Sequence, residues 1–358
     1  MTTTPKQNRG NFFEDFSVGQ QLVHATPRTV TEADAALYIA LYGSRFAVQS
    51  AETFATALGH RTRPLDDLLV FHIVFGKTVP DISLNAVANL GYAECRFLVP
   101  VYAGDTLAVT SEVIGLKQNS NGKTGVVYVR TSGENQHGEA VLSYVRWVMV
   151  RKRDAEAAAP EPVVPELASE VSPAAAASLL AGLSADAWDD ARAGSPHRLG
   201  DYAVGERIDH VDGATIEEAE HQLATRLYQN TAKVHFNQHT EGAGRFGRRL
   251  VYGGHIISMA RALTFNGLAN AAYVLAINAG RHAAPCFAGD TIYAWSEILA
   301  VDARADTSQA NASGFGALRV RTCAVKNRDA SDYPGADAGA TLPEDVVLDL
   351  DYWVAIPR

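Results

Sequence analysis

The chain carries one sequence pattern twice, in the same order along its length. The pairs that keep a constant spacing of 186 residues are Val18-Gly19 with Val204-Gly205, His24 with His210, Tyr42 with Tyr228, and Val48 with Val234. Farther along, Pro100 and Ala103-Gly104-Asp105-Thr106 recur as Pro285 and Ala288-Gly289-Asp290-Thr291, now 185 residues apart. A fixed order of matches with small slips in spacing is typical of a duplicated domain. The chain is therefore expected to fold as two similar halves.

The two copies differ at a position where chemistry is expected. His235 of the second copy stands where the first copy has Gln49. Imidazole is the side chain whose ordinary pKa suits proton transfer near neutral pH, whereas an amide does not exchange protons there. The pattern indicates one active site for each pair of domains, located in the second half.

Length and composition limit the possible classes of protein. A chain of 358 residues is long enough for two domains. The formal net charge is −9 without a block of Lys or Arg, so nucleic acid is not expected as a partner. Cys95, Cys286 and Cys323 show no metal or redox spacing, which favours reduced thiols in the cytoplasm. No apolar run is long enough for a membrane span.

The repeat and the composition divide the chain into three parts. Residues 11–153 are expected to form the first domain, and residues 196–358 the second. Between them, residues 154–170 are rich in Ala, Pro and Glu, which predicts a semi-rigid linker. The Ala-rich segment 174–193 is predicted to be a helix that leads into the second domain.

Each copy shows the same order of predicted elements. A first helix begins near Thr31 or Thr215, a loop with Gln49 or His235 follows, and then comes a longer apolar helix over 68–77 or 255–266. Strands are predicted over 93–99, 106–116, 124–132 and 141–151 of the first copy. One buried helix against a run of antiparallel strands predicts an α+β layered fold.

The segment from Tyr228 to His235 resembles the signature of the MaoC-like enoyl-CoA hydratases, Gly-Asp-x-Asn-Pro-x-His, which lies between the first helix and the central helix. Arg281, followed by Pro285 and Ala288-Gly289-Asp290-Thr291, resembles the downstream strand and turn of that family. The resemblance implies a tandem (double) hot-dog fold, each half a long central helix wrapped by an antiparallel sheet. It also implies a hydro-lyase that acts on an enoyl-CoA thioester. Coenzyme A would be part of the substrate, with no separate cofactor and no metal.

Two further segments, 66–72 and 85–92, are similar to members of this family that hydrate mesaconyl-CoA. The resemblance therefore implies reversible addition of water to mesaconyl-CoA, giving β-methylmalyl-CoA (2-methyl-3-hydroxysuccinyl-CoA). Two alternatives stay open. One is a hydratase for another straight or branched enoyl-CoA, and the other is a non-catalytic acyl-CoA-binding protein. Because hot-dog domains normally pair, a homo-oligomer is expected, most simply a dimer.

One departure from the family pattern concerns Asn230, which stands where the family has an aspartate. An amide cannot accept a proton near neutral pH but can position a water molecule. His235 is then expected to be the main acid and base, with Asn230 orienting the water. A carboxylate from elsewhere could share the role, and Glu241, Asp66 and Asp67 are candidates.

The remaining candidates follow from the chemistry of the substrate. Gly253 and Gly254 precede the second long helix, where a backbone N–H could stabilise the thioester oxygen as it gains charge. Arg245, Arg248 and Arg249 lie between His235 and these glycines and could bind a free substrate carboxylate. Tyr252 and Asp67 are also predicted to contact substrate, because the first copy has Asp66-Asp67 where the second has Tyr252-Gly253.

Overall fold

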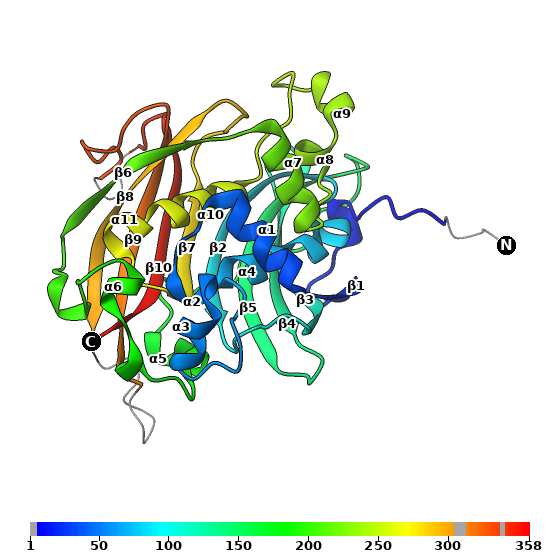
Figure 1. Cartoon of the computed structure of the whole chain (residues 1–358). Helices are drawn as coiled ribbons and strands as arrows, with labels where there is room; N and C mark the ends of the chain where they lie inside the picture. Colours follow the sequence, from blue (N-terminus) through cyan, green and yellow to red (C-terminus); the bar gives the residue numbers. More distant parts are fainter. Residues whose placement is uncertain (1–5, 304–312, 337–340) are drawn as a thin grey trace.

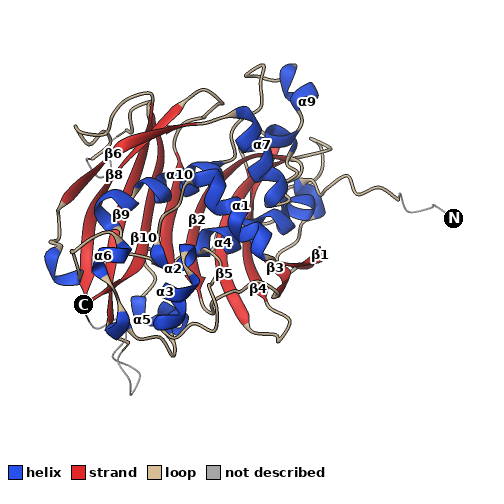
Figure 2. Cartoon of the chain, in the orientation of Figure 1, coloured by secondary structure: helices blue, strands red, loops and turns tan. Residues whose placement is uncertain are grey.

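The computed structural model describes residues 6–303, 313–336 and 341–358. Within them, ten antiparallel strands form one continuous sheet in the order β1-β3-β4-β5-β2-β7-β10-β9-β8-β6 (Figures 1 and 2). The strands are β1 (Gln21–Thr29), β2 (Ala86–Phe97), β3 (Thr106–Gln118), β4 (Thr124–Glu134), β5 (Ala140–Arg151), β6 (Arg207–Thr215), β7 (Tyr273–His282), β8 (Thr291–Asp302), β9 (Phe315–Lys326) and β10 (Val346–Pro357). Each half contributes five strands in equivalent order, as the repeat predicts.

The two halves meet where β2 pairs with β7. Tyr92 lies opposite Gly280, and Cys95 lies opposite Ile277, so the pairing has the two-fold symmetry of the repeat. Gly280 makes room for the neighbouring ring, because a Cβ there would lie 2.8 Å from Cδ2 of Tyr92. The seam between the halves is thus part of the sheet itself.

The helices pack against one face of this sheet, with α4 and α10 at its centre (Figure 1). All residues of α4 are buried, which explains why its sequence is apolar on every side. The helices are α1 (Glu32–Tyr42), α2 (Ala47–Ser50), α3 (Glu52–Ala57), α4 (Asp67–Thr78), α5 (Pro173–Ala176), α6 (Asp190–Ala193), α7 (Glu218–Leu227), α8 (Lys233–Phe236), α9 (Gln238–Gly242), α10 (Gly253–Leu263) and α11 (Phe265–Leu268). The predicted α+β class is confirmed. No helix in the described ranges is long and apolar enough to cross a membrane.

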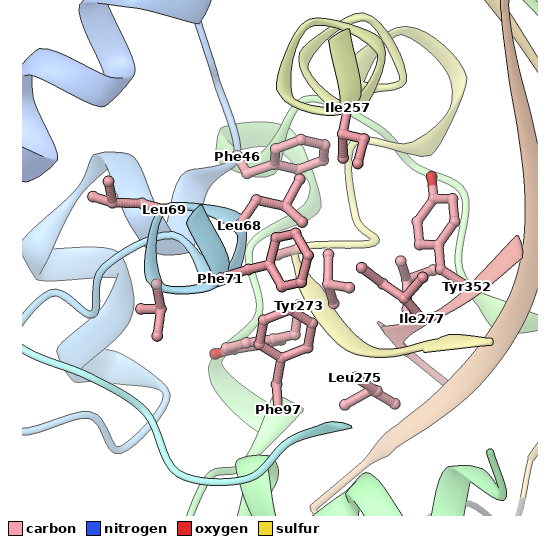
Figure 3. Packing of buried hydrophobic residues seen from close by; sticks show 14 of the residues in the cluster. Phe46, Leu68, Leu69, Phe71, Phe97, Ile257, Tyr273, Leu275, Ile277 and Tyr352 are labelled. Atoms are coloured by element: carbon pink, nitrogen blue, oxygen red, sulfur yellow. The ribbon is translucent and has the colours of Figure 1, made fainter. Parts of the chain in front are cut away.

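One hydrophobic core extends across both halves. Phe46, Leu68 and Phe71 of the first half are fully buried in it. They face Ile257 and Tyr352 of the second half in the close view of the packing (Figure 3). Since neither half could bury these side chains without the other, we expect them to fold as a unit.

The prediction of one helix over residues 174–193 is wrong. The segment forms α5, a 3₁₀ turn over Ala177–Leu180, a second one over Ala185–Ala187, and then α6. Gly182 interrupts it with a φ of +79°, a conformation that is open to glycine but cannot continue a right-handed helix. The short turns bury their apolar side chains in the core shared by the two halves, including Leu179 and Trp188. This packing decided the local structure over the high helix propensity of alanine.

The repeated histidines His24 and His210 are structural. Each ring donates or accepts a 2.8 Å hydrogen bond between Nε2 and a serine hydroxyl of the neighbouring strand, Ser111 or Ser296. His24 and His210 are both buried. Their recurrence therefore reflects the same strand packing in each half.

Candidate active site

A cavity of about 420 Å³ lies between the two halves, beside the β2–β7 seam. It is large enough to hold a small acyl group. Its polar and aromatic wall residues come from both copies of the repeat and are Phe75, Ser83, Asn89, Tyr92, Arg146, Asn230, His235, Arg245, Phe246, Tyr252 and His282. The single histidine predicted from the asymmetry of the repeat therefore lines a cavity that neither half could form alone.

His235 lies in α8, half-buried, with its ring in the cavity wall. Its Nδ1 is 2.8 Å from the carbonyl oxygen of Leu250. Since a carbonyl oxygen only accepts, Nδ1 carries the proton and Nε2 keeps its lone pair. Burial lowers the pKa of His235 to about 4, although the hydrogen bond to Leu250 opposes this shift. The imidazole is therefore neutral at pH 7 and can act as a base.

The equivalent position of the first copy has a different environment. Gln49 is buried, and its Nε2 donates a 3.0 Å hydrogen bond to the carbonyl oxygen of Ala272. It is absent from the wall of the 420 Å³ cavity. The side chain thus has a structural role at the place where the second copy has a base.

Asn230 is buried in the middle of the loop between α7 and α8, and it lines the cavity. Its Oδ1 accepts a 3.2 Å hydrogen bond from the backbone N–H of Ala232, which fixes the amide plane. Its Nδ2 makes no protein hydrogen bond within the described part of the chain. The amide is thus held rigidly with its donor free for a water molecule or a substrate oxygen.

Replacing Asn230 by Ala is expected to lower kcat/KM about tenfold to a hundredfold, because the attacking water loses a positioning group. The enoyl-thioester absorbance assay measures this loss. Ser44→Ala is the matched control, since Ser44 occupies the equivalent position of the first copy and lies outside the cavity wall. Unchanged turnover by the Asn230 variant would contradict the positioning role.

The loop that carries Asn230 rests directly on helix α4 at Gly76. A Cβ at Gly76 would lie 1.8 Å from the carbonyl oxygen of Tyr228 and 3.4 Å from the backbone nitrogen of Asn230. The loop also contains Gln229 at a φ of +55°, a left-handed conformation that is uncommon for a residue with a side chain. A residue without a side chain is therefore required at this crossing.

Gly76→Ala is expected to displace this loop and to lower the free energy of unfolding by about 1–3 kcal/mol, the usual cost of overpacking. Urea unfolding measures the loss, and turnover per folded molecule reports the displacement of Asn230. Gly200→Ala is the control, because nothing lies within 4 Å of a Cβ built there. Wild-type stability of the Gly76 variant would show that the crossing tolerates a side chain.

No described side chain caps the first turn of α10, which begins at the cavity wall. Its N-cap is Tyr252, whose side chain caps no amide, and Gly253 lines the cavity. In the first copy, by contrast, the Asp66 carboxylate accepts a 2.9 Å hydrogen bond from the N–H of Leu68 at the start of α4. An uncapped helix N-terminus favours negative charge, so this turn suits the thioester oxygen of a bound enoyl-CoA.

The two predicted glycines occupy different positions. Gly253 contacts the cavity and the ring of His282, which would lie 2.4 Å from a Cβ at Gly253. Gly254 is outside the cavity wall and packs against His72, whose Cε1 would lie 2.5 Å from a Cβ. The structure therefore places Gly253 at the cavity and Gly254 at the contact between the central helices.

Tyr252 lines the cavity as predicted for a substrate contact, with its ring centroid 5.5 Å from that of His235. Burial raises its pKa well above the ordinary value, so the phenol stays protonated. Its hydroxyl lies 3.4 Å from Nδ1 of His72. The ring thus forms an uncharged wall next to the proposed base.

The structure separates the three predicted arginines. Arg245 is exposed at the cavity and stacks over the ring of Phe246 at 5.0 Å. Arg248 donates to the carbonyl oxygen of Ala288 and stacks over Phe287 at 4.8 Å. Arg249 forms an ion pair with Glu218. Arg248 and Arg249 do not line the cavity, because their guanidinium groups are held by protein partners.

The acidic candidates also lie outside the cavity. Asp67 is buried at the start of α4, where its carboxylate accepts a 2.9 Å hydrogen bond from the N–H of Val274. Burial raises the pKa of Asp67 to about 8, and the neighbouring Asp66 adds to this shift. Neither aspartate nor Glu241 is among the wall residues, and no described carboxylate lines the cavity. None of the three candidate carboxyl groups is therefore placed in the cavity to share proton transfer with His235.

Sequence reasoning missed Tyr92, His282 and Arg146. Tyr92 and His282 face each other across the seam, with the hydroxyl 3.3 Å from Nε2. This contact depends on the pairing of strands from different halves, which no local pattern reports. Arg146 did leave a signal, since it interrupts the apolar inward-facing series Leu142, Tyr144, Val148 and Val150 of β5.

Comparison with known proteins shows which family the chain belongs to. A family model described as mesaconyl-CoA hydratase matches residues 2–340. The chain belongs to this family. It is 62% identical over 356 residues to the β-methylmalyl-CoA dehydratase of Chloroflexus aurantiacus, and the match covers 99% of each chain. Members of the family are hydro-lyases by name, and the predicted family resemblance is confirmed.

Solved structures confirm the fold of this family member. The structure of a putative MaoC domain protein dehydratase from Chloroflexus aurantiacus aligns with a TM-score of 0.93 and 61% identity, over 99% of both chains. Rv0216 of Mycobacterium tuberculosis, described as a double hot-dog protein, aligns with a TM-score of 0.74 and 25% identity, over 96% of this chain and 98% of the other. The predicted double hot-dog fold is therefore confirmed.

Proposed function

We propose that this protein catalyses the reversible hydration of mesaconyl-CoA to β-methylmalyl-CoA. Membership of the mesaconyl-CoA hydratase family supports the reaction and a CoA-thioester substrate. The observation that carries the proposal is the state of His235, a neutral imidazole whose Nδ1 is held by Leu250 and whose other nitrogen is free in a cavity of acyl size. This is the base that addition of water requires.

In the proposed mechanism, the oxygen of water bonds to the β-carbon, which bears the free carboxylate of the acyl group. Nε2 of His235 takes a proton from this water, and the electron pair of the double bond moves towards the thioester oxygen. The N–H groups at the start of α10 stabilise the resulting enolate. The enolate then takes a proton at the methyl-bearing α-carbon and regenerates the thioester.

The imidazolium formed in the first step is proposed as the source of this α-proton. It is the charged acid next to the reacting atoms, since no described carboxylate lines the cavity. Burial lowers the pKa of His235 to about 4 in the free protein, so the charged ring is a stronger acid than an ordinary imidazolium and readily gives up its proton. Asn230 holds the water in position to attack the β-carbon and takes no proton itself.

The deciding experiment follows the ultraviolet absorbance of the enoyl thioester with mesaconyl-CoA and, separately, with crotonyl-CoA. We expect rapid loss with mesaconyl-CoA and much slower loss with crotonyl-CoA. Preference for crotonyl-CoA would make the protein a hydratase for another enoyl-CoA. Tight binding of both thioesters without loss of absorbance would identify a non-catalytic acyl-CoA-binding protein, and each of these results would overturn the proposal.

We further propose that the enzyme works without a metal or other cofactor, in the cytoplasm, as a homodimer. No group of three or more described His, Cys, Asp or Glu side chains is arranged to hold a metal ion. Cys95, Cys286 and Cys323 are free and buried, which agrees with a reducing compartment. Turnover that survives dialysis against a chelator, and a dimeric mass by light scattering, are the expected results.

A further inference from the structure

Arg146 is a buried cation in the wall of the proposed active site. It is 0% exposed, lies on the inner face of β5, and lines the 420 Å³ cavity. Its Nη2 donates to the hydroxyl of Thr78 at 2.8 Å and to that of Ser83 at 3.4 Å. Its Nε and Nη1 have no hydrogen-bond partner, and no described carboxylate forms an ion pair with it. A buried charge without a counter-charge is costly unless a ligand supplies one.

The second copy also contains a buried arginine, Arg261, and its surroundings can be compared with those of Arg146. Phe75 and Arg146 of the first copy correspond in the repeat to Arg261 and Tyr352 of the second. Arg261 is also buried, and it donates to Thr264 and to the carbonyl oxygen of Ala271. Asp66 and the buried Asp67 lie close enough for a negative charge on either to raise the pKa of Arg261, against the lowering by burial. Only about 10 Å³ of space adjoins it.

The two arginines thus differ in what surrounds them. Arg261 has two acidic side chains beside it and adjoins a cavity of about 10 Å³, whereas Arg146 lines the cavity of about 420 Å³, whose described wall residues include no acid. Arg146 is instead flanked by aromatic groups, with its guanidinium 4.2 Å from the ring centroid of Phe75. The compensation that Arg261 receives from the protein is missing at Arg146, at the place where substrate would bind.

We propose that Arg146 binds the free carboxylate of the dicarboxylic acyl group and so selects this substrate class. The inference rests on the proposed function. Water adds to the carbon that bears this carboxylate, so a guanidinium there offsets the negative charge that would repel an incoming hydroxide-like oxygen. Thr78 and Phe75 hold the guanidinium in place before substrate binds, and Nε and Nη1 remain available as donors.

In this proposal, Arg146 takes the place of the three arginines that were predicted from the sequence to bind the substrate carboxylate. Arg248 and Arg249 are held by protein partners outside the cavity, and Arg245 is exposed at its edge. A water-accessible arginine gives a weaker and more screened interaction than a buried one. The buried position of Arg146 makes it the group able to reject acyl groups without a carboxylate.

The test compares two thioesters in the same enzyme samples. One is mesaconyl-CoA, and the other is 2-methylcrotonyl-CoA, in which a methyl group replaces the free carboxylate. Arg146→Gln and Arg146→Met are expected to lower the ratio of the two kcat/KM values about a hundredfold or more, as for truncation of one partner of a buried charge pair. Arg146→Lys, which keeps the charge but not the two-pronged geometry, should give an intermediate ratio.

Arg261→Met is the matched control, since it removes a buried arginine outside the cavity and should leave the ratio unchanged. The ratio does not depend on the folded fraction, so partial unfolding of a variant does not affect it. Should a variant be too inactive to assay, calorimetric titration with succinyl-CoA and butyryl-CoA measures the same preference by binding. The wild type is expected to bind succinyl-CoA more tightly, and the Arg146 variants are not.

The outcomes separate the two proposals. A wild-type enzyme that does not hydrate mesaconyl-CoA would overturn the proposed function. A wild-type enzyme that prefers mesaconyl-CoA, with Arg146 variants that keep this preference, would overturn only the role of Arg146. Loss of the preference in Arg261→Met to the same extent would also overturn it, because the effect would then follow from removal of any buried arginine.

Discussion

Replacing His235 by Gln is expected to lower kcat for hydration of mesaconyl-CoA about a thousandfold, within the range that general base catalysis contributes. The variant keeps a similar volume and a donor for the carbonyl oxygen of Leu250, which His235 now contacts at 2.8 Å. It removes the lone pair of Nε2 that takes the proton from water. Loss of the enoyl-thioester absorbance under saturating substrate measures the effect.

Gln49→Ala provides the comparison within the same molecule. Gln49 occupies the position of His235 in the first copy, and its amide is bound to Ala272 outside the cavity. We expect nearly wild-type turnover per folded molecule from this variant. If the His235 variant kept its activity while the Gln49 variant lost it, catalysis would belong to the first half.

Unfolding in mild acid is the second large effect that we expect. Five histidines are buried with pKa values lowered by desolvation to between about 3 and about 4, namely His60, His72, His210, His221 and His255. Their ordinary pKa is about 6.5. Between these values the unfolded chain binds protons that the folded chain does not, so stability falls as the pH decreases below about 6.5.

The size of this effect follows from the number of protons. Each such histidine lowers the free energy of unfolding by about 1.4 kcal/mol for each pH unit within that window. Several of them together are comparable to the whole stability of a typical protein. We therefore expect cooperative unfolding above pH 4, and stability that is nearly independent of pH above 7 as far as these groups are concerned.

Urea unfolding at a series of pH values between 7.5 and 5 measures this dependence. His60→Gln should reduce the slope of stability against pH by about 1.4 kcal/mol per unit, the contribution of one buried histidine. His197→Gln, at an exposed position, is the control and should leave the slope unchanged. Equal slopes for the wild type and the His60 variant would show that His60 is protonated in the folded state.

The same pKa values bear on activity. Because burial lowers the pKa of His235 to about 4, kcat/KM for hydration should show no decline near pH 6.5, where an ordinary histidine would be protonated. Loss of activity should follow loss of structure as the pH falls.

Prediction from sequence succeeded where the signal is periodic or repeated. The long apolar runs predicted both central helices, which the structure places at Asp67–Thr78 and Gly253–Leu263. The helix predicted to begin near Thr31 does so, and the Thr31 side chain caps it by accepting from the N–H of Asp34. The segment 174–193 was predicted wrongly, because burial of Leu179 and Trp188 in the core prevailed over helix propensity.

The candidate site was only partly predictable. His235, Asn230, Tyr252, Gly253 and Arg245 all line one cavity, in agreement with their selection from the repeat and the family pattern. Asp67, Gly254, Arg248 and Arg249 do not line it. Spacing along the chain placed these residues near His235, but their contacts with other elements hold them elsewhere.

The sequence by itself determined the duplicated double hot-dog fold and the asymmetry that gives one copy His235 and the other Gln49. The duplication and the asymmetry follow from the identity of residues at a fixed spacing, which can be read along one chain, and the resemblance to a known family implied the double hot-dog fold. Only the tertiary structure decided that the cavity lies across the β2–β7 seam and that Arg146 of the first half faces it with no acid beside it. Long-range strand pairing sets which side chains meet and which charges stay unpaired, and no local pattern encodes that pairing.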